Sequence, residues 1–212
     1  MNPKKDNHSG SKLSLICGIV GMVGCFAVML ANVAGIIVVE KHNPISETIS
    51  KLAIGKYAWI QDLGLDFFAA ALFAIAIGLY AWNLGGAAWK VGSVLLGVLG
   101  VDILLIAEHN QYAGREGVGA SIHIYCVYAL GAIFTLLTIL LAFGLRNLNR
   151  RWYHFSLSIA VIWTILAPFF FIAPTSWNGA YERFLALIML TWVTAISWLL
   201  IRRGIGQVSE TT

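Results

Sequence analysis

The stretch Ile122–Leu145, IHIYCVYALGAIFTLLTILLAFGL, contains no Asp, Glu, Lys or Arg. A helix needs about 20 predominantly apolar residues to cross the hydrocarbon core of a bilayer, so this stretch predicts a membrane span. The same length and polarity recur along the chain. The other predicted spans are Leu13–Val39, Ile60–Asn83, Trp89–Ala107, Tyr153–Ala173 and Ala180–Ile201.

The composition agrees with these spans. Of 212 residues, 59% are hydrophobic and only 11% are charged, and the mean hydropathy is +0.80. A soluble domain needs more charge than this to cover its surface. We therefore predict an all-α fold, a polytopic six-helix transmembrane bundle over residues 13–203. Tails occupy residues 1–12 and 204–212, which leaves no soluble catalytic domain.

The first apolar stretch follows Lys4, Lys5 and Lys12, as the apolar region of a signal peptide would. It is too long for such a region, and it ends in VVEKH rather than in small residues, so we predict a retained first span. The three cysteines all fall within predicted spans, which argues against a disulfide framework.

The basic residues predict the orientation of the bundle. Lys and Arg are enriched in cytoplasmic loops. Here they gather in both tails and in the second and fourth loops, whereas most acidic residues lie toward the opposite helix ends. We predict cytoplasmic termini, a bacterial inner membrane, and an acidic cluster on the outer side. The sequence pI of about 9.1 is thus a topology signal, and no nucleic-acid partner is expected.

The longest loop, residues 40–59, predicts a short amphipathic helix on the outer surface. Asn43 and Pro44 form a good N-cap and first helical position. Ile45, Ile49 and Leu52 then follow at helical spacing, so one face of this helix would be apolar. Two roles are open for it: anchoring the loop at the membrane surface, or covering a site between the helices.

Polar residues are predicted at one depth near the outer side. Asn32, Asp66 and Asp102 each lie six or seven residues from the outer end of their helices, which is about 10 Å at 1.5 Å per residue. Ionisable groups inside a bilayer are costly and therefore mark candidate functional positions. The others near this level are Asp62, His123, Tyr128 and Glu182.

Three interpretations of these residues compete. In the first, the polar groups hydrogen-bond with one another and have a structural role. In the second, His109 or His123 binds zinc together with one or more of Asp62, Asp66 and Asp102, and the metal activates a water molecule. In the third, the residues bind a cation, an amine or a lipid headgroup, with Arg183 or Arg115 available for anionic groups.

Several activities are disfavoured by what the sequence lacks. The helix interiors contain no lysine for a retinal Schiff base, and no phosphate-binding loop, nucleophile elbow or dinucleotide fingerprint occurs. A proton or ion conduit would carry polar groups across the whole bilayer. The inner halves of the predicted helices carry mostly hydroxyl groups, which favours a site open to one side.

Two backbone features are also predicted. Small residues recur in the first and third spans, and in membranes these let helices approach closely. We expect close packing within one bundle, and an oligomer is left open. Pro168 should kink the fifth helix.

The segment from His42 to Gly64, HNPISETISKLAIGKYAWIQDLG, resembles the DUF998 family of bacterial and archaeal membrane proteins. The run from Gly97 to Glu108, the Ser121-Ile-His123 start of the fourth span and the Glu182-Arg183 start of the sixth are similar to it as well. The resemblance implies a six-helix fold and assigns no activity. It marks Ser46, Ser50, Asp62, Asp102, His123 and Glu182 as positions to test.

The leading hypothesis is a membrane protein whose outward-facing polar pocket binds a small molecule, a cation or a lipid headgroup. Asp66 and Asp102 would form the floor of this pocket and His123 its wall. Membrane lipids are its expected partners. The first alternative is a zinc-dependent hydrolase acting on lipid, with His109, His123 and Asp102 as ligands. The second is a structural or assembly subunit without a ligand. The predicted ligand-binding residues are Asn32, Ser46, Ser50, Asp62, Asp66, Asp102, Tyr128, Glu182 and Arg183.

Overall fold

The computed structural model describes residues 3–113 and 115–208, and this part of the chain is helical with no strands. Six long helices, each long and apolar enough to cross a membrane, confirm the predicted six-helix membrane fold. They are α1 (Pro3–Val38), α2 (Ala58–Trp82), α3 (Gly86–His109), α4 (Val118–Leu145), α5 (Arg150–Leu166) and α6 (Asn178–Gly204). Three short 3-10 helices accompany them: η1 (Ile49–Ala53), η2 (Asn110–Tyr112) and η3 (Ala167–Phe171).

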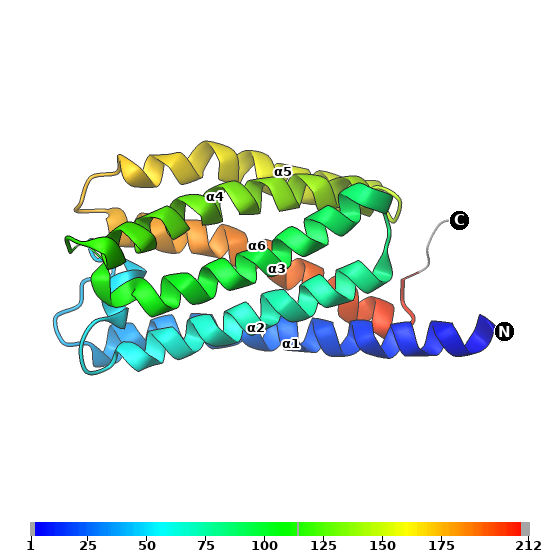
Figure 1. The fold of residues 1–212 in the computed structure, drawn as a ribbon, viewed down its shortest axis with the longest axis horizontal. Coiled ribbons are helices and arrows are strands. Elements are labelled where there is room, and N and C mark those ends of the chain that lie inside the picture. Colours follow the sequence, from blue (N-terminus) through cyan, green and yellow to red (C-terminus); the bar gives the residue numbers. More distant parts are fainter. Residues whose placement is uncertain (1–2, 114, 209–212) are drawn as a thin grey trace.

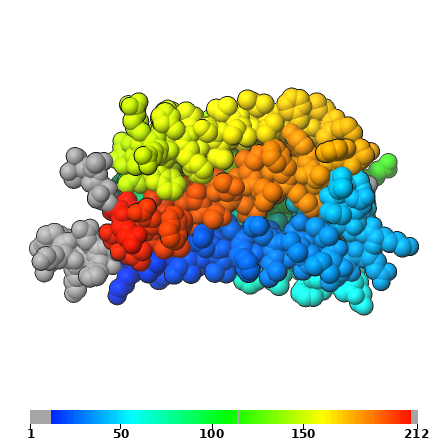
Figure 2. Space-filling view, turned by 180° about the vertical axis from the view of Figure 1, so that it is seen from behind, coloured from blue at the N-terminus to red at the C-terminus, as the bar shows by residue number. Residues whose placement is uncertain are grey.

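The helices run side by side, and both ends of the chain lie at the same end of the bundle (Figure 1). We call this the terminal end. The opposite end carries residues 39–57, η2 and the connection from η3 to α6, and we call it the loop end. Each helix from α1 to α4 packs along the next one in the chain, and α6 returns beside α1. Viewed from behind, α6 lies between α5 and α1, but it touches α5 much less than α1 (Figure 2).

Close glycine contacts join α1 to its two neighbours, as predicted. A Cβ atom built on Gly24 would lie 2.4 Å from Ala71 Cβ in α2. One built on Gly21 would lie 2.3 Å from Ser197 Oγ in α6. Both distances are too short for any side chain, so these positions let the helix backbones approach each other as small residues do in membrane proteins.

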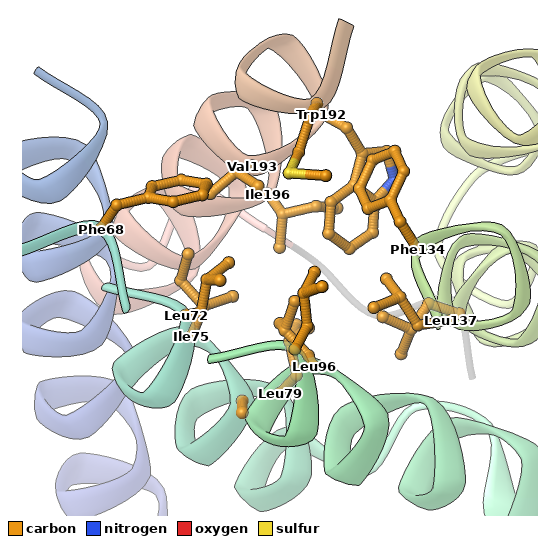
Figure 3. Close-up of a cluster of buried hydrophobic side chains, with 14 of the residues drawn as sticks. Phe68, Leu72, Ile75, Leu79, Leu96, Phe134, Leu137, Trp192, Val193 and Ile196 are labelled. Atoms are coloured by element: carbon orange, nitrogen blue, oxygen red, sulfur yellow. The ribbon is translucent and has the colours of Figure 1, made fainter. Parts of the chain in front are cut away.

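The core fills the centre of the bundle, and its residues labelled in Figure 3 come from four helices. Figure 3 shows this cluster: Phe68, Leu72, Ile75 and Leu79 of α2, Leu96 of α3, Phe134 and Leu137 of α4, and Trp192, Val193 and Ile196 of α6. The indole N–H of Trp192 is paired, because Trp192 Nε1 donates to Ser156 Oγ at 2.9 Å. Ser156 in turn donates to the Thr138 carbonyl at 2.8 Å, which links α4, α5 and α6. A buried donor without such a partner would be destabilising.

Two elements differ from the sequence-based expectation. The α-helical part of the fifth span ends at Leu166, and the chain continues through Pro168 as the 3-10 helix η3. In the loop, only Ile49–Ala53 is helical, and Leu52 and Ala53 are buried rather than lying on a surface. The second difference has a physical reason. In a longer loop helix the backbone groups would hydrogen-bond to one another, but here side chains of α6 bind these groups instead.

Candidate ligand cavity at the loop end

Arg183, in the first turns of α6, holds the loop by its backbone. Its Nη1 atom donates to the carbonyl oxygens of Pro44 at 3.0 Å, Glu47 at 2.8 Å and Gly179 at 3.0 Å. The first two carbonyls belong to the loop and would otherwise pair within a helix. Arg183 is suited to this position because its planar guanidinium offers several donors in a fixed geometry.

The remaining guanidinium nitrogens reach two side chains. Nε donates to Asn32 Oδ1 in α1 at 3.3 Å, and Nη2 lies 3.1 Å from His42 Nε2. The other ring nitrogen of His42, Nδ1, lies 3.3 Å from Glu47 Oε2. An Nδ1–H tautomer of His42 satisfies both contacts, because Nε2 then accepts from Arg183 while Nδ1 donates to the carboxylate.

Two further contacts fix the loop to α6. The Glu182 carboxylate accepts a hydrogen bond from the backbone N–H of Ile49, at the start of η1. The backbone N–H of Ala180 donates to the carbonyl of Ile45 at 2.9 Å. Gly179 permits this approach, since a Cβ atom there would lie 2.1 Å from the Glu47 carbonyl oxygen. The loop therefore covers the beginning of α6, as Figure 2 shows.

The loop contains the two groups of this network that lie outside the membrane-spanning helices. Burial lowers the pKa of the His42 imidazole, and the positive charges of Arg183 and Lys51 lower it further, while Glu47 acts in the opposite direction. The pKa of the Glu47 carboxyl is also lowered, chiefly by the backbone N–H of Asn43, which donates to it at 2.9 Å. Neutral His42 and ionised Glu47 are therefore the forms that the folded loop favours.

Beneath the loop lies a cavity of about 730 Å³ among all six helices. This volume is in the range of small-molecule sites in proteins. Most of its wall is apolar, from residues such as Val28, Leu65, Ile103, Val127 and Leu190. Its polar lining residues near the loop end are Asn32, Ser50, Gln61, Asn110, Tyr128, Glu182 and Arg183.

Three amide side chains in this lining leave polar atoms without a protein partner. These atoms are Asn32 Nδ2, Gln61 Oε1 and Asn110 Oδ1. Gln61 and Asn110 are each only 1% exposed. Buried polar atoms of this kind are normally hydrogen-bonded, so the three atoms mark where a bound molecule or water would be held.

The cavity reaches the apolar surface of the bundle. Met29 and Val33 of α1 and Leu187 of α6 line the cavity, yet each is about half exposed on the outside. On another side, the rings of Tyr128 and Phe171 lie 4.4 Å apart at the wall and are also exposed. A molecule in the cavity would therefore be accessible from the acyl-chain region of a surrounding membrane.

Ser50 joins the cavity to a buried histidine. Its Oγ atom lies 3.3 Å from His123 Nε2, and both residues are buried. Ser50 lines the cavity, while His123 stands behind it at the start of α4. A hydroxyl paired with an imidazole at this distance is the arrangement in which histidine can take up the hydroxyl proton.

A second hollow at the loop end is acidic. It has a volume of about 250 Å³ and lies between α2 and α3, where Asp62, Asp66 and Glu108 line it. We call it the acidic groove. Asp66 is exposed, and Asp62 accepts a hydrogen bond from Asn110 Nδ2 at 3.3 Å. Asn110 therefore connects the acidic groove with the larger cavity.

The structure brings together some of the residues singled out from the sequence and separates others. Asn32, Ser50, Tyr128, Glu182 and Arg183 line one cavity. Asp62 and Asp66 line the acidic groove instead. Asp66 and Asp102 were expected at the floor of the pocket and His123 at its wall, but none of these three residues lines the cavity. Asp102 lies beside Cys126, and Ser46 lies in the loop without lining either hollow.

The three residues predicted as metal ligands do not form a cluster. His109 Nδ1 lies 2.8 Å from the Leu105 carbonyl, and His123 pairs with Ser50. Among the described residues, no three His, Cys, Asp or Glu side chains are gathered so that they could hold one metal ion. The zinc hypothesis stays a prediction from the sequence.

The sequence reasoning missed four residues of this region. Gln61 and Asn110 are the buried amides of the cavity, and His42 and Glu47 belong to the loop network. Gln61 and Asn110 do have a signal in the sequence, because their positions near the ends of predicted spans place both amides at the loop end. Nothing in the local sequence of His42 indicates its contact with Arg183, 141 residues away.

Fold and site together define a multi-pass, six-helix membrane protein with an amphipathic cavity at its loop end. The chain belongs to the DUF998 family: the model described as "Protein of unknown function (DUF998)" matches residues 22–199, so the resemblance noted in the sequence is confirmed. Comparisons with curated proteins and with solved structures gave no match.

Proposed function

We propose that this protein binds a membrane amphiphile, with the polar headgroup under the loop and the acyl chain between the helices. The observation that carries the proposal is the polarity of the cavity wall. Polar side chains line the cavity near the loop end, and apolar side chains line it toward the centre of the bundle. A lipid or a related amphiphile has the same division between headgroup and chain.

Three helices show this division at matching depths. Along α2 the lining changes from Gln61 to Phe68, and from Asn110 at the start of η2 it changes to Ile103 in the adjoining α3. Along α6 it changes from Arg183 to Leu190. Each step covers seven residues, or about 10 Å of helix. The deeper hydroxyl of Thr135 donates to the Gly131 carbonyl at 3.0 Å and adds little polarity to the wall.

Lateral access supports a ligand that arrives from the membrane. The exposed lining residues Met29, Val33 and Leu187 belong to apolar surfaces of α1 and α6. Because these surfaces face acyl chains in a bilayer, a lipid could enter without first crossing water. The loop, held by Arg183 and Glu182, covers the headgroup end.

Quenching of tryptophan fluorescence by lipids with brominated acyl chains tests this proposal. The indole of Trp163 lines the cavity and lies within reach of a bound chain. We expect Gly131→Leu to weaken saturable quenching, since a Cβ atom at Gly131 meets nothing within 4 Å and a larger side chain would occupy part of the cavity. Gly97→Leu is the matched control, because its Cβ would contact only Ala76, at 3.8 Å, outside the cavity. Equal quenching of both variants and the unaltered protein would contradict the proposal.

We further propose that the loop end faces the outside of a bacterial inner membrane and that both termini are cytoplasmic. The basic residues at the terminal end support this orientation, because Lys and Arg favour the cytoplasmic side. They include Lys90, Arg146, Arg150, Arg202 and Arg203. A cysteine introduced at Arg115, in the loop before α4, should react with a membrane-impermeant reagent added outside intact cells. Labelling from the cytoplasmic side alone would show the opposite orientation.

A second candidate function is hydrolysis of an ester in the bound amphiphile. The observation in its favour is the contact of 3.3 Å between Ser50 Oγ and His123 Nε2 beside the cavity. In this reaction Ser50 Oγ would bond to the ester carbonyl carbon as His123 takes its proton. The histidine would then give that proton to the departing alcohol as the carbon–oxygen bond breaks. Water would release the acid and restore the Ser50 hydroxyl.

Labelling of the purified protein with a fluorophosphonate ester tests this second function. Activated serine hydroxyls react with such reagents, so labelling should be lost in Ser50→Ala and in His123→Gln. Ser46→Ala is the control, as Ser46 lies in the same loop but does not line the cavity. Retained labelling in Ser50→Ala, or no labelling of the unaltered protein, would exclude this reaction.

A further inference from the structure

We infer that the headgroup bound in this cavity is uncharged and carries at least two hydroxyl groups, as a glycerol headgroup does. The inference rests on the proposed binding of an amphiphile and adds the chemistry of its polar part. It is drawn from the buried polar atoms that the protein itself leaves unpaired.

The orientation of two amides is set by their other contacts. Asn32 accepts from Arg183 Nε through Oδ1, so its Nδ2 atom is the free one and remains a donor. Asn110 donates to Asp62 through Nδ2, so its Oδ1 atom is free and remains an acceptor. The cavity therefore offers one amide donor and one amide acceptor whose roles are not interchangeable.

Gln61 supplies the third free atom. Its Oε1 is an acceptor without a protein partner, and the side chain is 1% exposed at the cavity wall in α2. The three residues come from α1, α2 and η2. All three line the cavity near the loop end, and their unpaired atoms comprise two acceptors and one donor.

Hydroxyl groups match this set, because each hydroxyl can both donate and accept. A phosphate monoester is mostly doubly ionised at neutral pH and then offers only acceptors, so it pairs poorly with the two amide oxygens. A trimethylammonium group offers neither donor nor acceptor. A headgroup with two hydroxyls can donate to Gln61 and Asn110 and accept from Asn32.

The charged residues of the wall favour an uncharged headgroup as well. Arg183 donates to three carbonyl oxygens and to Asn32, and it contacts His42. Glu182 is adjacent to this cation and accepts from the Ile49 backbone. The hydrogen bonds of Arg183 and Glu182 are used mainly to hold the loop, and the two side chains are of opposite sign, so the wall does not offer an excess of one charge to a ligand.

Four single-chain amphiphiles with the same brominated acyl chain test the inference. They are a monoacylglycerol, its di-O-methyl ether, a lysophosphatidate and an acylated choline. Each is titrated into the full-length protein in phosphatidylcholine nanodiscs, and quenching of tryptophan fluorescence is measured. We expect the monoacylglycerol to bind at least about tenfold more tightly than each of the others, since unmade hydrogen bonds to buried groups reduce affinity.

The outcomes separate this inference from the proposal on which it rests. Equal affinity for all four amphiphiles, with weaker binding in Gly131→Leu, would overturn the hydroxyl assignment and leave amphiphile binding intact. Preference for the phosphate or the choline would overturn the assignment too. Absence of saturable quenching by every amphiphile would overturn both.

Substitutions of the amide residues test the assignment of a headgroup with hydroxyl groups. We expect Gln61→Leu and Asn110→Leu to reduce the preference for the monoacylglycerol over its di-O-methyl ether to about twofold or less, because each removes an acceptor. Gln111→Leu is the matched control, since Gln111 is exposed and lines the acidic groove rather than the cavity. An unchanged preference in both amide variants would contradict the inference. The comparison of ligands on the unaltered protein remains decisive if a variant fails to fold.

Discussion

The terminal half and the loop half of the bundle are held together differently, and two glycines of α4 illustrate this. At the terminal end, a Cβ atom on Gly144 would lie 2.1 Å from the ring of Trp89. Halfway along α4, a Cβ atom on Gly131 would meet nothing within 4 Å. The same helix is thus packed tightly at its terminal end and borders a cavity around its middle.

Different interactions stabilise the two halves. The terminal half relies on apolar packing and close helix contacts, with large buried side chains such as Trp89, Leu96 and Leu145. The loop half relies on hydrogen bonds from Arg183 and Glu182 to backbone groups that would otherwise be unpaired. Close packing gives the bundle a rigid base, and polar contacts allow the loop to cover a space that side chains do not fill.

Removing Arg183 should have the largest effect on stability. Arg183→Met leaves the carbonyls of Pro44 and Glu47 without their donor and leaves Glu182 without the adjacent cation. Loss of one member of a fully buried charge pair costs about 3–5 kcal/mol, and because Arg183 and Glu182 are only partly buried we expect a loss of about 2–4 kcal/mol. Thermal unfolding in detergent, followed by tryptophan fluorescence, measures this loss. Arg146→Met, at an exposed position of the terminal end, is the control and should change the unfolding temperature little.

A comparison of Gly144→Ala with Gly131→Ala tests the difference in packing directly. Gly144→Ala should destabilise the protein by about 1–3 kcal/mol, because the new methyl group overlaps the ring of Trp89. Gly131→Ala should be neutral or stabilising by up to about 1 kcal/mol, because alanine favours a helix over glycine and space is available. If both variants lost the same stability, the loop half would be as tightly packed as the terminal half.

Acidification should loosen the loop without unfolding the terminal half. The folded loop lowers the pKa of His42 below its ordinary value of about 6.5, so the unfolded loop binds more protons and its attachment weakens as pH falls through this region. Protonation of Nε2 also removes the acceptor that faces Arg183. Glu47, whose pKa is lowered too, adds a second loss at pH values below its ordinary value of 4.5.

A spin label on Ile45→Cys reports this change, since Ile45 lies in the loop with an exposed side chain. Its mobility should increase between pH 7.5 and pH 5.5, values about one unit either side of the ordinary histidine pKa. In His42→Gln the increase in this range should disappear. A pH-independent spectrum in the unaltered protein would contradict the role of His42.

The acidic groove should contribute least to stability. Asp66 is exposed and lies near Glu108 and Asp62. Asp66→Asn removes a like charge without leaving a buried partner, so it should stabilise the protein by no more than about 0.5 kcal/mol. Unfolding in low and high salt measures this effect, which should shrink as salt rises. A loss of several kcal/mol would show that Asp66 has a structural contact in the fold.

The fold was predictable because its signal is local. Stretches such as Ile122–Leu145 contain enough consecutive apolar residues to cross a bilayer, and in hydrocarbon such a segment must form a helix to pair its own backbone. All six helices were found this way, and most of their ends agree within a few residues. The glycines of α1 likewise predicted close contacts between helices, although the sequence did not show which helices lie beside α1.

The sequence predicted how far from the helix ends the candidate site residues lie. It did not predict toward which neighbouring helix each side chain points. Counting residues placed Asn32, Asp66 and Asp102 at one level, but only Asn32 lines the cavity. The face of a helix that turns toward its neighbours depends on packing with the whole bundle. The loop shows the same limit: its apolar spacing predicted a surface helix, and Arg183 of α6 instead binds its carbonyls.

The sequence by itself determined a membrane protein of six helices, its family, and the end of the bundle at which polar side chains gather. These properties depend on the composition of continuous segments. Only the tertiary structure decided that Gln61, Asn110, Asn32 and Arg183 share one cavity while Asp66 faces a separate groove. Such groupings arise from helix rotation and from contacts between residues more than 100 positions apart, as between Asn32 and Arg183, which a linear pattern does not encode.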